Sequence, residues 1–503
     1  MPFHGRPSDA CGPCRKGRLR CDRARPSCTQ CIRKSIICSG YRKVALLLFK
    51  DESESTARKV QWEKNGEIYQ PPSTRPTNDF EPITVTLFNH TDLPSPSRSI
   101  TPSQDDRALA YFMSSYIPAS PFYYLSEVYK TTTPIAQDAV SSTILAASLA
   151  SLSLHVGSSK LMENARTHYS EALAQTNAAL ASPNTAILDR TLISVLTLGL
   201  FEAIAFSSRR SPESWTTHTL GAVQLIRLRG NKQLKTSLGT RLFLQTCNNI
   251  RSSCIARSTP LPNEFVYFCE QAKPFLDHSI PNARLGPLMD NIISLRVQLM
   301  AKHIGTHQIP ALIHETLQLD EQVLTLMDML PPSWRYEAMP QHRIPSWAYQ
   351  GLAHTYADHR ISRHWNTLHQ TRLFANEVVW HLAAHVAWAK QHPELCLYIK
   401  DFDAEALQAT AEANRTQVIG NIFASVPHFL GEEGTAFGPA ARFLIWPLTI
   451  VAERKLTPEP ARRYATWCLY EIARQARIPQ ALHAAEAIKS EASTDWMHLF
   501  VLG

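Results

Sequence analysis

The sequence lacks the short motifs that mark common enzyme sites. Its 503 residues contain no P-loop, no G-x-G-x-x-G, no G-x-S-x-G and no H-E-x-x-H. Strand alternation and hairpin dipeptides are scarce after residue 104, whereas patterns of helical period are frequent. We therefore expect that the protein is not an enzyme and that its larger part is all-α.

Signals that would direct the chain into or across a membrane are also missing. Residues 1–10 contain no apolar run, so we expect no secretory signal peptide. The long uncharged stretch 139–159 carries seven serines, a threonine and His155, which makes it a poor membrane span. We predict that this stretch is a buried helix of small residues, that the protein has no membrane partner, and that its thiols are reduced inside a cell.

Most of the chain has little net charge. The total is +8, yet residues 1–43 hold eleven Lys and Arg against two Asp, which is +9, and residues 44–503 come to −1. An excess confined to one short segment indicates a polyanionic partner, nucleic acid first. A nuclear-import signal or a solvated tail is the alternative at this point.

Cysteine is scarce except in the same segment. Six of the eleven cysteines fall within 28 residues, and the pattern Cys-x2-Cys-x6-Cys occurs twice, shifted by 17. These six are the predicted metal ligands: Cys11, Cys14, Cys21, Cys28, Cys31 and Cys38. The other five are scattered, and we expect them to be buried apolar residues: Cys247, Cys254, Cys269, Cys396 and Cys468.

The repeat predicts two zinc ions. A C-x2-C pair lets two thiolates reach one metal, and structural zinc takes four ligands in a tetrahedron. Two zinc ions need eight ligand positions, which six sulfurs fill only if two of them bridge both ions. A single zinc would leave two cysteines idle, and a disulfide framework needs an oxidising compartment. An iron–sulfur site stays open, although the paired spacing and the basic surroundings disfavour it.

The segment CGPCRKGRLRCDRARPSCTQCIRKSIIC resembles the zinc binuclear cluster domain of fungal transcription factors, over about residues 10–42. The resemblance implies that Cys11 and Cys28 are the bridging ligands. The proline that the family usually has shortly before its fourth cysteine corresponds to Pro26, whose fixed φ would stiffen the turn. The resemblance also implies a nuclear, sequence-specific and zinc-dependent regulator of genes transcribed by RNA polymerase II, with double-stranded DNA as its partner.

The first half of the repeat is the expected DNA-binding half. It is basic between its second and third cysteines, whereas Ile32, Ile36 and Ile37 give the second half apolar residues that we expect to pack. In the family, a lysine three residues before the third cysteine reads guanine in a CGG triplet, and the main chain just before it contacts bases. Arg18 and Gly17 occupy these positions here. Arginine departs from the pattern but can bond guanine O6 and N7, so a CGG-like triplet is expected.

The remaining basic residues of this half are expected to contact phosphates, which give affinity without sequence information. They are Arg15, Lys16, Arg20 and Arg23.

Composition divides the rest of the chain in two. Residues 44–104 are predicted to be a flexible linker, because residues 71–104 contain seven Pro and eleven Ser or Thr. Residues 105–503 are predicted to be a large helical regulatory domain. No a/d pattern lasts three heptads, so a homodimer, if it forms, is expected without a coiled coil. A coactivator or corepressor is a further expected partner, and the acidic and aromatic residues 491–500 could recruit one or form a docked last helix.

Several helices and one histidine-rich segment are predicted within this domain. Residues 184–206 are apolar nearly all round and predict a buried helix, and a second helix is expected to start at Ser211-Pro212-Glu213 and end at Gly230. The stretches Ser214–Phe243 and Arg360–Phe374 resemble the fungal-specific regulatory domain that accompanies the zinc cluster.

Six histidines cluster between residues 354 and 385. His381 and His385 have the spacing of a helical metal site. The favoured interpretation places the histidines on polar helix faces, with Trp365, Trp380 and Trp388 in the core. The six are His354, His359, His364, His369, His381 and His385.

Two other functions compete with DNA-binding regulation. An all-α enzyme or ligand-binding protein with an appended zinc module would explain the helical part, although it lacks catalytic motifs. A zinc-buffering protein would explain the cysteines but not the basic charge concentrated beside them. Retention of one sequence from a random duplex pool would favour the regulator over both.

Overall fold

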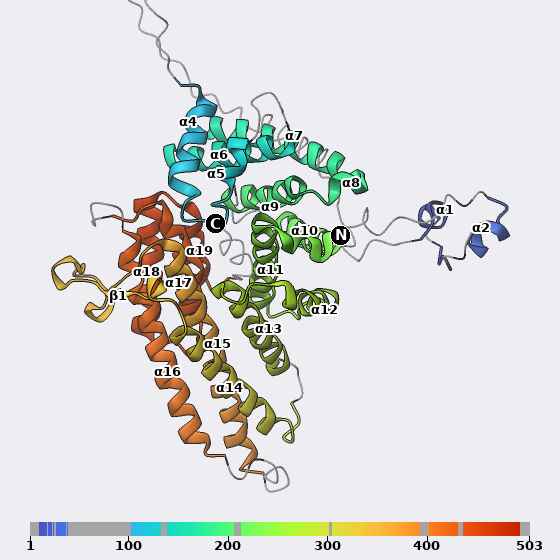
Figure 1. Ribbon diagram of the computed structural model, residues 1–503. Coiled ribbons are helices and arrows are strands. Elements are labelled where there is room, and N and C mark those ends of the chain that lie inside the picture. Colours follow the sequence, from blue (N-terminus) through green and yellow to red (C-terminus); the bar gives the residue numbers. More distant parts are fainter. Residues whose placement is uncertain are drawn as a thin grey trace, which may run out of the picture.

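The computed structural model shows a small N-terminal unit and a large helical body (Figure 1). It describes residues 10–38 except 18, 23, 25, 26 and 37, and residues 102–492 except 132–137, 206–212, 301–303, 393–398, 400–401 and 431–435. The small unit consists of two short helices that pack on each other, α1 (Gly12–Lys16) and α2 (Thr29–Arg33). Most of the predicted linker, residues 44–101, lies outside the described residues.

The helical body confirms the all-α prediction. Its first helices, drawn in blue to green in Figure 1, form one layered group. They are α4 (Gln104–Tyr111), α5 (Leu125–Thr131), α6 (Ala139–Val156), α7 (Ser159–Ala181), α8 (Pro183–Ala186) and α9 (Asp189–Ile204). The next group is α10 (Glu213–Arg229), α11 (Ser237–Arg257), α12 (Asn263–Ala272) and α13 (Pro281–Met300). The last is α14 (Ile309–Asp328), α15 (His359–Ala389), α16 (Ala404–Ala424), α17 (Ile445–Glu453), α18 (Glu459–Ala476) and α19 (Pro479–Lys489).

Strand content is very low in the described part of the chain. Two strands of two residues each, β1 (Glu337–Ala338) and β2 (His354–Thr355), pair antiparallel between α14 and α15. Glu337 is opposite Thr355 in this pair. Helix on helix packing therefore makes the core, as the scarcity of strand patterns predicted.

Local signals in the sequence set several helix ends. Ser103 and Asp106 form a reciprocal capping box at the start of α4, with the Asp106 amide donating to Ser103 Oγ over 3.1 Å. Asp138 caps α6, where its side chain accepts the Ser141 N–H over 3.0 Å. Gly230 has φ +59 directly after α10, which confirms the predicted end of that helix. The predicted start at Ser211 and Pro212 lies outside the described residues.

Helix α6 is the small-residue helix predicted over residues 139–159. Among the described residues it is the one helix long and apolar enough to cross a membrane, and 61% of it is buried within the protein. A buried core helix satisfies the same criteria of length and composition, so this is weak evidence for a span. Two of its buried hydroxyls bond to the helix itself: Thr143 donates to the Val140 carbonyl over 2.8 Å and Ser148 to the Ile144 carbonyl over 2.7 Å.

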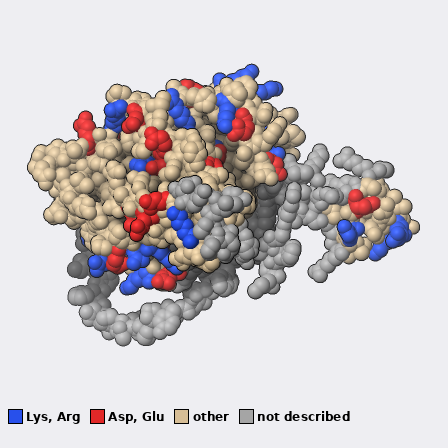
Figure 2. Space-filling view, turned by 90° about the horizontal axis from the view of Figure 1, so that it is seen from below, with Lys and Arg blue, Asp and Glu red and all other residues tan. Residues whose placement is uncertain are grey.

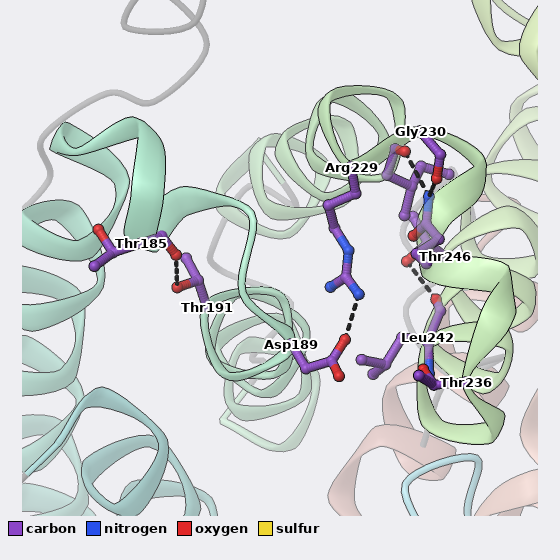
Figure 3. A network of polar contacts seen from close by, with 11 residues as sticks. Thr185, Asp189, Thr191, Arg229, Gly230, Thr236, Leu242 and Thr246 are labelled. Carbon is purple, nitrogen blue, oxygen red and sulfur yellow. Dashed lines mark hydrogen bonds and ion pairs between the residues drawn. The ribbon is translucent and has the colours of Figure 1, made fainter.

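The single helix predicted over residues 184–206 was wrong in its extent. The chain forms α8 and then α9, with Leu188 extended between them at φ −71 and ψ 149. Thr191 Oγ1 donates to the Thr185 carbonyl over 2.6 Å across this break, and Asp189 pairs with Arg229 at the end of α10 (Figure 3). The apolar run alone did not reveal the break, because Leu188 is itself apolar. The prediction that α9 is buried is confirmed.

Two ion pairs between buried arginines and buried or partly buried aspartates join helices of the body. Arg372 on α15 donates through Nε and Nη2 to Asp320 on α14 over 2.8 and 3.0 Å. Arg251 on α11 makes the same two-pronged contact with Asp290 on α13 over 2.7 and 2.8 Å. Such pairs fix how the helices meet, because losing one partner of a buried pair typically costs about 3–5 kcal/mol.

Candidate zinc and DNA-binding site

The two halves of the cysteine repeat fold alike. Each begins with a cysteine directly before a short helix, and each helix contains the second cysteine of its half. At α2 the Cys28 Sγ accepts the Cys31 backbone N–H over 3.4 Å and so acts as the helix cap. The C-x2-C spacing thereby brings two sulfurs together within one turn, as predicted.

The six sulfurs form two overlapping groups of four. In each group all ligand atoms lie within 4.8 Å of one another. The Cys11 sulfur lies 3.6 Å from both Cys28 and Cys31, and the Cys14 sulfur lies 3.6 Å from Cys28. The first group is Cys11, Cys14, Cys21 and Cys28; the second is Cys11, Cys28, Cys31 and Cys38. Cys11 and Cys28 belong to both groups.

This arrangement fits two zinc ions. Four thiolates suit tetrahedral zinc, and two shared sulfurs supply the eight positions that two ions require. Cys11, Cys14, Cys28 and Cys31 are fully buried, while Cys21 and Cys38 are partly buried. Loss of solvation and the neighbouring sulfurs raise the pKa of Cys14 to about 12. A bound dication supplies the positive charge that lets such thiols ionise.

One contact between the halves was not predicted from the sequence. Asp22 directly follows the third cysteine, and its carboxylate accepts the Thr29 backbone N–H over 3.1 Å and the Thr29 hydroxyl over 2.7 Å. The hydrogen bond from the Thr29 side chain lowers the pKa of Asp22. Thr29 is the first residue of α2 and directly follows Cys28. The carboxylate therefore ties the first half to the start of the second, next to a shared sulfur.

Replacing this carboxylate should weaken zinc binding while leaving all six sulfurs in place. For Asp22→Ala we expect about tenfold lower zinc affinity, because losing a partner that bonds a ligand directly typically costs about 10–100-fold and Asp22 acts through Thr29, the residue next to a ligand. Competition with a coloured chelator measures the change, and Thr29→Val is a matched variant that keeps the backbone N–H donor but removes the hydroxyl. A smaller loss for Thr29→Val than for Asp22→Ala is expected. Unchanged zinc affinity in both variants would show that the contact does not position the cluster.

The structure describes three of the six predicted DNA-contacting positions in full. Lys16 and Gly17 at the end of α1 are exposed, and so is Arg20. Arg15 lies in α1, but its side chain, like Arg18 and Arg23 as a whole, lies outside the described residues. Leu19 turns inward and packs on the cysteine cluster, with its N–H bonded to the Cys14 carbonyl over 2.8 Å.

The small unit carries its basic side chains on the outside (Figure 2). Its described charged residues are Lys16, Arg20, Arg33, Lys34 and a single acid, Asp22. With four basic side chains against one acid, the described surface carries an excess of positive charge. A surface of this kind attracts the phosphates of nucleic acid.

The expectation that isoleucines of the second half pack inward was wrong. Ile32 is 65% exposed and Ile36 is 46% exposed, while Ile37 lies outside the described residues. The unit is too small to cover these side chains, and its buried centre consists of cysteines and Ala10. Isoleucines in the second half of the repeat therefore do not predict an apolar core, because the cysteine ligands occupy the interior of the small unit.

The other cysteines and the histidines behave as structural residues in the described part. Cys247, Cys254, Cys269 and Cys468 are buried, as predicted, and Cys396 lies outside the described residues. No group of three or more ligands that includes a histidine was found there. His364 and His369 on α15 are buried rather than on a polar face. Trp365 is in the core, as predicted. The prediction that Trp388 is a core residue was wrong, because its side chain is 53% exposed.

Comparison with known proteins identifies two domains. Residues 9–45 match the fungal Zn(2)-Cys(6) binuclear cluster domain, and residues 97–264 match the fungal specific transcription factor domain. No curated protein and no solved structure gives a significant match. The first resembling stretch, Ser214–Phe243, lies within the second match, and Arg360–Phe374 lies beyond it. The chain thus carries a zinc cluster domain that binds two zinc ions, together with a domain of fungal transcription factors.

Proposed function

We propose that this DNA-binding transcription regulator uses the first half of its zinc cluster to read a CGG-like triplet in the major groove. In this proposal Arg18 bonds guanine O6 and N7, and the main chain at Gly17 approaches the neighbouring base. Arg15, Lys16, Arg20 and Arg23 hold phosphates. The observation that carries the proposal is the pair of sulfur groups sharing Cys11 and Cys28, with exposed basic residues directly beside it.

The ligand roles follow from the same sharing. Cys14 and Cys21 would hold one zinc ion and Cys31 and Cys38 the other, with Cys11 and Cys28, which belong to both sulfur groups, available to each. Bound zinc would keep the thiolates ionised, and the sulfurs would then hold α1 and α2 in a fixed relation. The basic end of α1 then has a defined orientation from which to meet the duplex.

Gly17 supports a close approach of DNA to the main chain. A Cβ at this position would lie 3.4 Å from the nearest Leu19 and Pro13 atoms, which is ordinary contact, and the backbone is not in the left-handed region. The fold of the small unit therefore does not require glycine there. A partner that comes close to the exposed backbone does give a reason for it.

The domain layout belongs to the same proposal. Residues 1–43 bind DNA, residues 44–104 form the linker, and residues 105–503 regulate transcription of RNA polymerase II genes in the nucleus. The fungal transcription factor match supports the last role for its own range, 97–264. A homodimer and a coactivator or corepressor are the proposed protein partners. Selection from a random duplex pool tests the whole proposal, because enrichment of one short motif requires a sequence-specific reader.

Arg18 and Arg20 should fail in different ways when replaced. Arg18→Ala should cost about 1–3 kcal/mol and relax selection at one base pair, because it removes a bidentate base contact. Arg20→Ala should weaken all sites alike and reduce the salt slope by about 0.9, because it removes one phosphate contact. Titration of each variant against single-base site changes at several salt concentrations separates the two effects.

Both variants should still bind two zinc ions, since neither residue is a ligand, and metal content is therefore the control. An even loss of affinity across the panel for Arg18→Ala, with selectivity intact, would reassign Arg18 to the phosphates. Selection lost at one base pair in Arg20→Ala would mean that the roles of the two arginines are exchanged.

A further inference from the structure

A cavity of about 190 Å³ lies in the helical body, far along the chain from the zinc cluster. Residues of α11, α13 and α15 line it, together with the segment around Tyr123 and the start of α17. Helix α13 packs on α11 and also on α15 (Figure 1). One water molecule occupies about 30 Å³ in the liquid, so the cavity has room for a small organic molecule.

Three side chains that line the cavity have polar atoms without a hydrogen-bond partner. They are Gln245 Nε2, Asn249 Oδ1 and His364 Nε2. All three residues are at least nine-tenths buried, with exposures of 6%, 3% and 5%. A buried polar group without a partner destabilises a fold, so three around one cavity are unfavourable unless another molecule satisfies them.

The contacts of these residues show which hydrogen bonds are still open. Gln245 Oε1 accepts the Tyr124 hydroxyl over 2.9 Å, so its amide nitrogen is free to donate. His364 Nδ1 lies 2.8 Å from Asn282 Oδ1, which makes Nδ1 the protonated nitrogen. Burial lowers the pKa of His364 to about 4, so the ring is neutral near pH 7 and Nε2 is an acceptor. The cavity thus offers one amide donor and two acceptors, His364 Nε2 and Asn249 Oδ1.

The charge of the lining favours an anion. Its described residues include Arg360 and Arg363 and no Asp or Glu. Arg360 pairs with Asp358 outside the lining over 2.7 Å. Arg363 lies 4.2 Å from the centre of the Phe443 ring and donates to the Ala119 carbonyl over 3.2 Å. Burial lowers the pKa of Arg363 to about 9, so it is still a cation near pH 7.

We propose that this cavity binds a small carboxylic acid that carries an amino group or two hydroxyls. The carboxylate meets Arg363 and Gln245 Nε2, and two hydrogens of the amino group, or one from each hydroxyl, donate to Asn249 Oδ1 and His364 Nε2. Such a ligand satisfies all three open polar atoms at once, which neither a hydrocarbon nor a simple fatty acid does. Part of the cavity is lined by residues of α13 and α15, which lie beyond the matched residues 97–264. The site therefore depends on helices that the domain match does not cover.

Thermal unfolding of the full-length zinc-loaded chain tests the site. The probes are D-glycerate, L-serine and L-glutamine, which combine a carboxylate with two hydroxyls or with an amino group. Succinate lacks these donor groups and ethanolamine lacks the carboxylate, so these two are the controls. At a concentration about 100 times its Kd, a bound probe lowers the unfolding constant about 100-fold and raises Tm. We expect a saturable rise with at least one of the three acids and none with either control.

Asn249→Leu separates a binding site from a defect of packing. It replaces a buried amide whose oxygen has no partner by an apolar side chain of similar shape, so the Tm of the ligand-free protein should stay the same or rise. The same variant should abolish the response to the probe. Thr457→Val is the matched control, because Thr457 Oγ1 is also buried and unpartnered but does not line the cavity. It should leave the probe response unchanged, and Arg363→Gln should reduce that response at least tenfold.

The outcomes are decisive in both directions. No saturable shift with any of the three acids would overturn the proposal. A rise in Tm with succinate and ethanolamine as large as the rise with the three acids would also overturn it. So would an Asn249→Leu variant that is less stable and still binds the probe. DNA binding of the same preparation is measured in parallel, so that a failure of the cavity proposal is distinguishable from a failure of the zinc cluster proposal.

Discussion

Removing zinc should unfold the N-terminal segment completely. The described part of this segment has no apolar core, since its buried residues are Ala10 and four cysteines. Ile32 and Ile36, the apolar residues expected to provide one, are exposed. Structural zinc supplies roughly 10–16 kcal/mol in small modules of this kind, as much as the whole stability of a typical domain, roughly 5–15 kcal/mol. Without the metal nothing else offsets the loss of chain entropy.

The measurement uses a peptide of residues 1–45, which covers the matched domain. Metal analysis should give two zinc ions per chain, and circular dichroism should show that a chelator removes the fold and added zinc restores it. The Cys28→Ser variant, which lacks a shared sulfur, should lose both zinc ions. The Cys14→Ser variant, which lacks a sulfur of one group only, should keep the zinc ion of the other group more readily. A stoichiometry near one, or a spectrum indifferent to chelation, would contradict the two-ion cluster.

The zinc site was predictable because its information is local. Two ligands three residues apart reach one metal whatever the rest of the chain does, and the same spacing occurs at Cys11 and Cys28. The sharing of these two cysteines was implied by the family resemblance and is matched by the two overlapping sulfur groups. The all-α character of the body was equally readable, because helical periodicity is also a local property.

Contacts between distant residues were not predictable in the same way. The Asp22–Thr29 contact depends on how the two halves meet, although an acid directly after the third cysteine and a threonine directly after the fourth were visible. Trp388 looked like a core residue because periodicity assigns a face but does not say what covers it. The prediction that the isoleucines of the small unit pack inward was wrong for the same reason.

The cavity shows this limit most clearly. Gln245, Asn249 and His364 come from α11 and α15, more than a hundred residues apart in the sequence. Each alone is an ordinary polar residue on a helix with apolar neighbours. Only the packing of α11, α13 and α15 places their open polar atoms around one space, so no pattern of residues along the chain could have indicated it.

The helical body on its own should be folded but unable to bind a specific DNA site. The excess of positive charge lies in residues 1–43, and the remaining residues sum to −1. Specific binding of regulators is typically 10³–10⁷ times tighter than their nonspecific binding, so removing the reading unit should cost a factor in this range. The fragment should start at residue 102 rather than 105, because Ser103 and Asp106 cap the first helix of the body.

This comparison needs the selected duplex, a scrambled duplex and two proteins, residues 102–503 and the full chain. Circular dichroism should show a helical, cooperatively unfolding fragment, so that lost binding is not mistaken for lost folding. The full chain should prefer the selected duplex, and the fragment should bind neither at physiological salt. A full chain with Arg18→Ala is the informative intermediate, since it keeps the zinc cluster and its remaining basic residues while losing one base contact. Tight and selective binding by residues 102–503 would place the DNA-reading surface in the helical body and would refute its assignment to the zinc cluster.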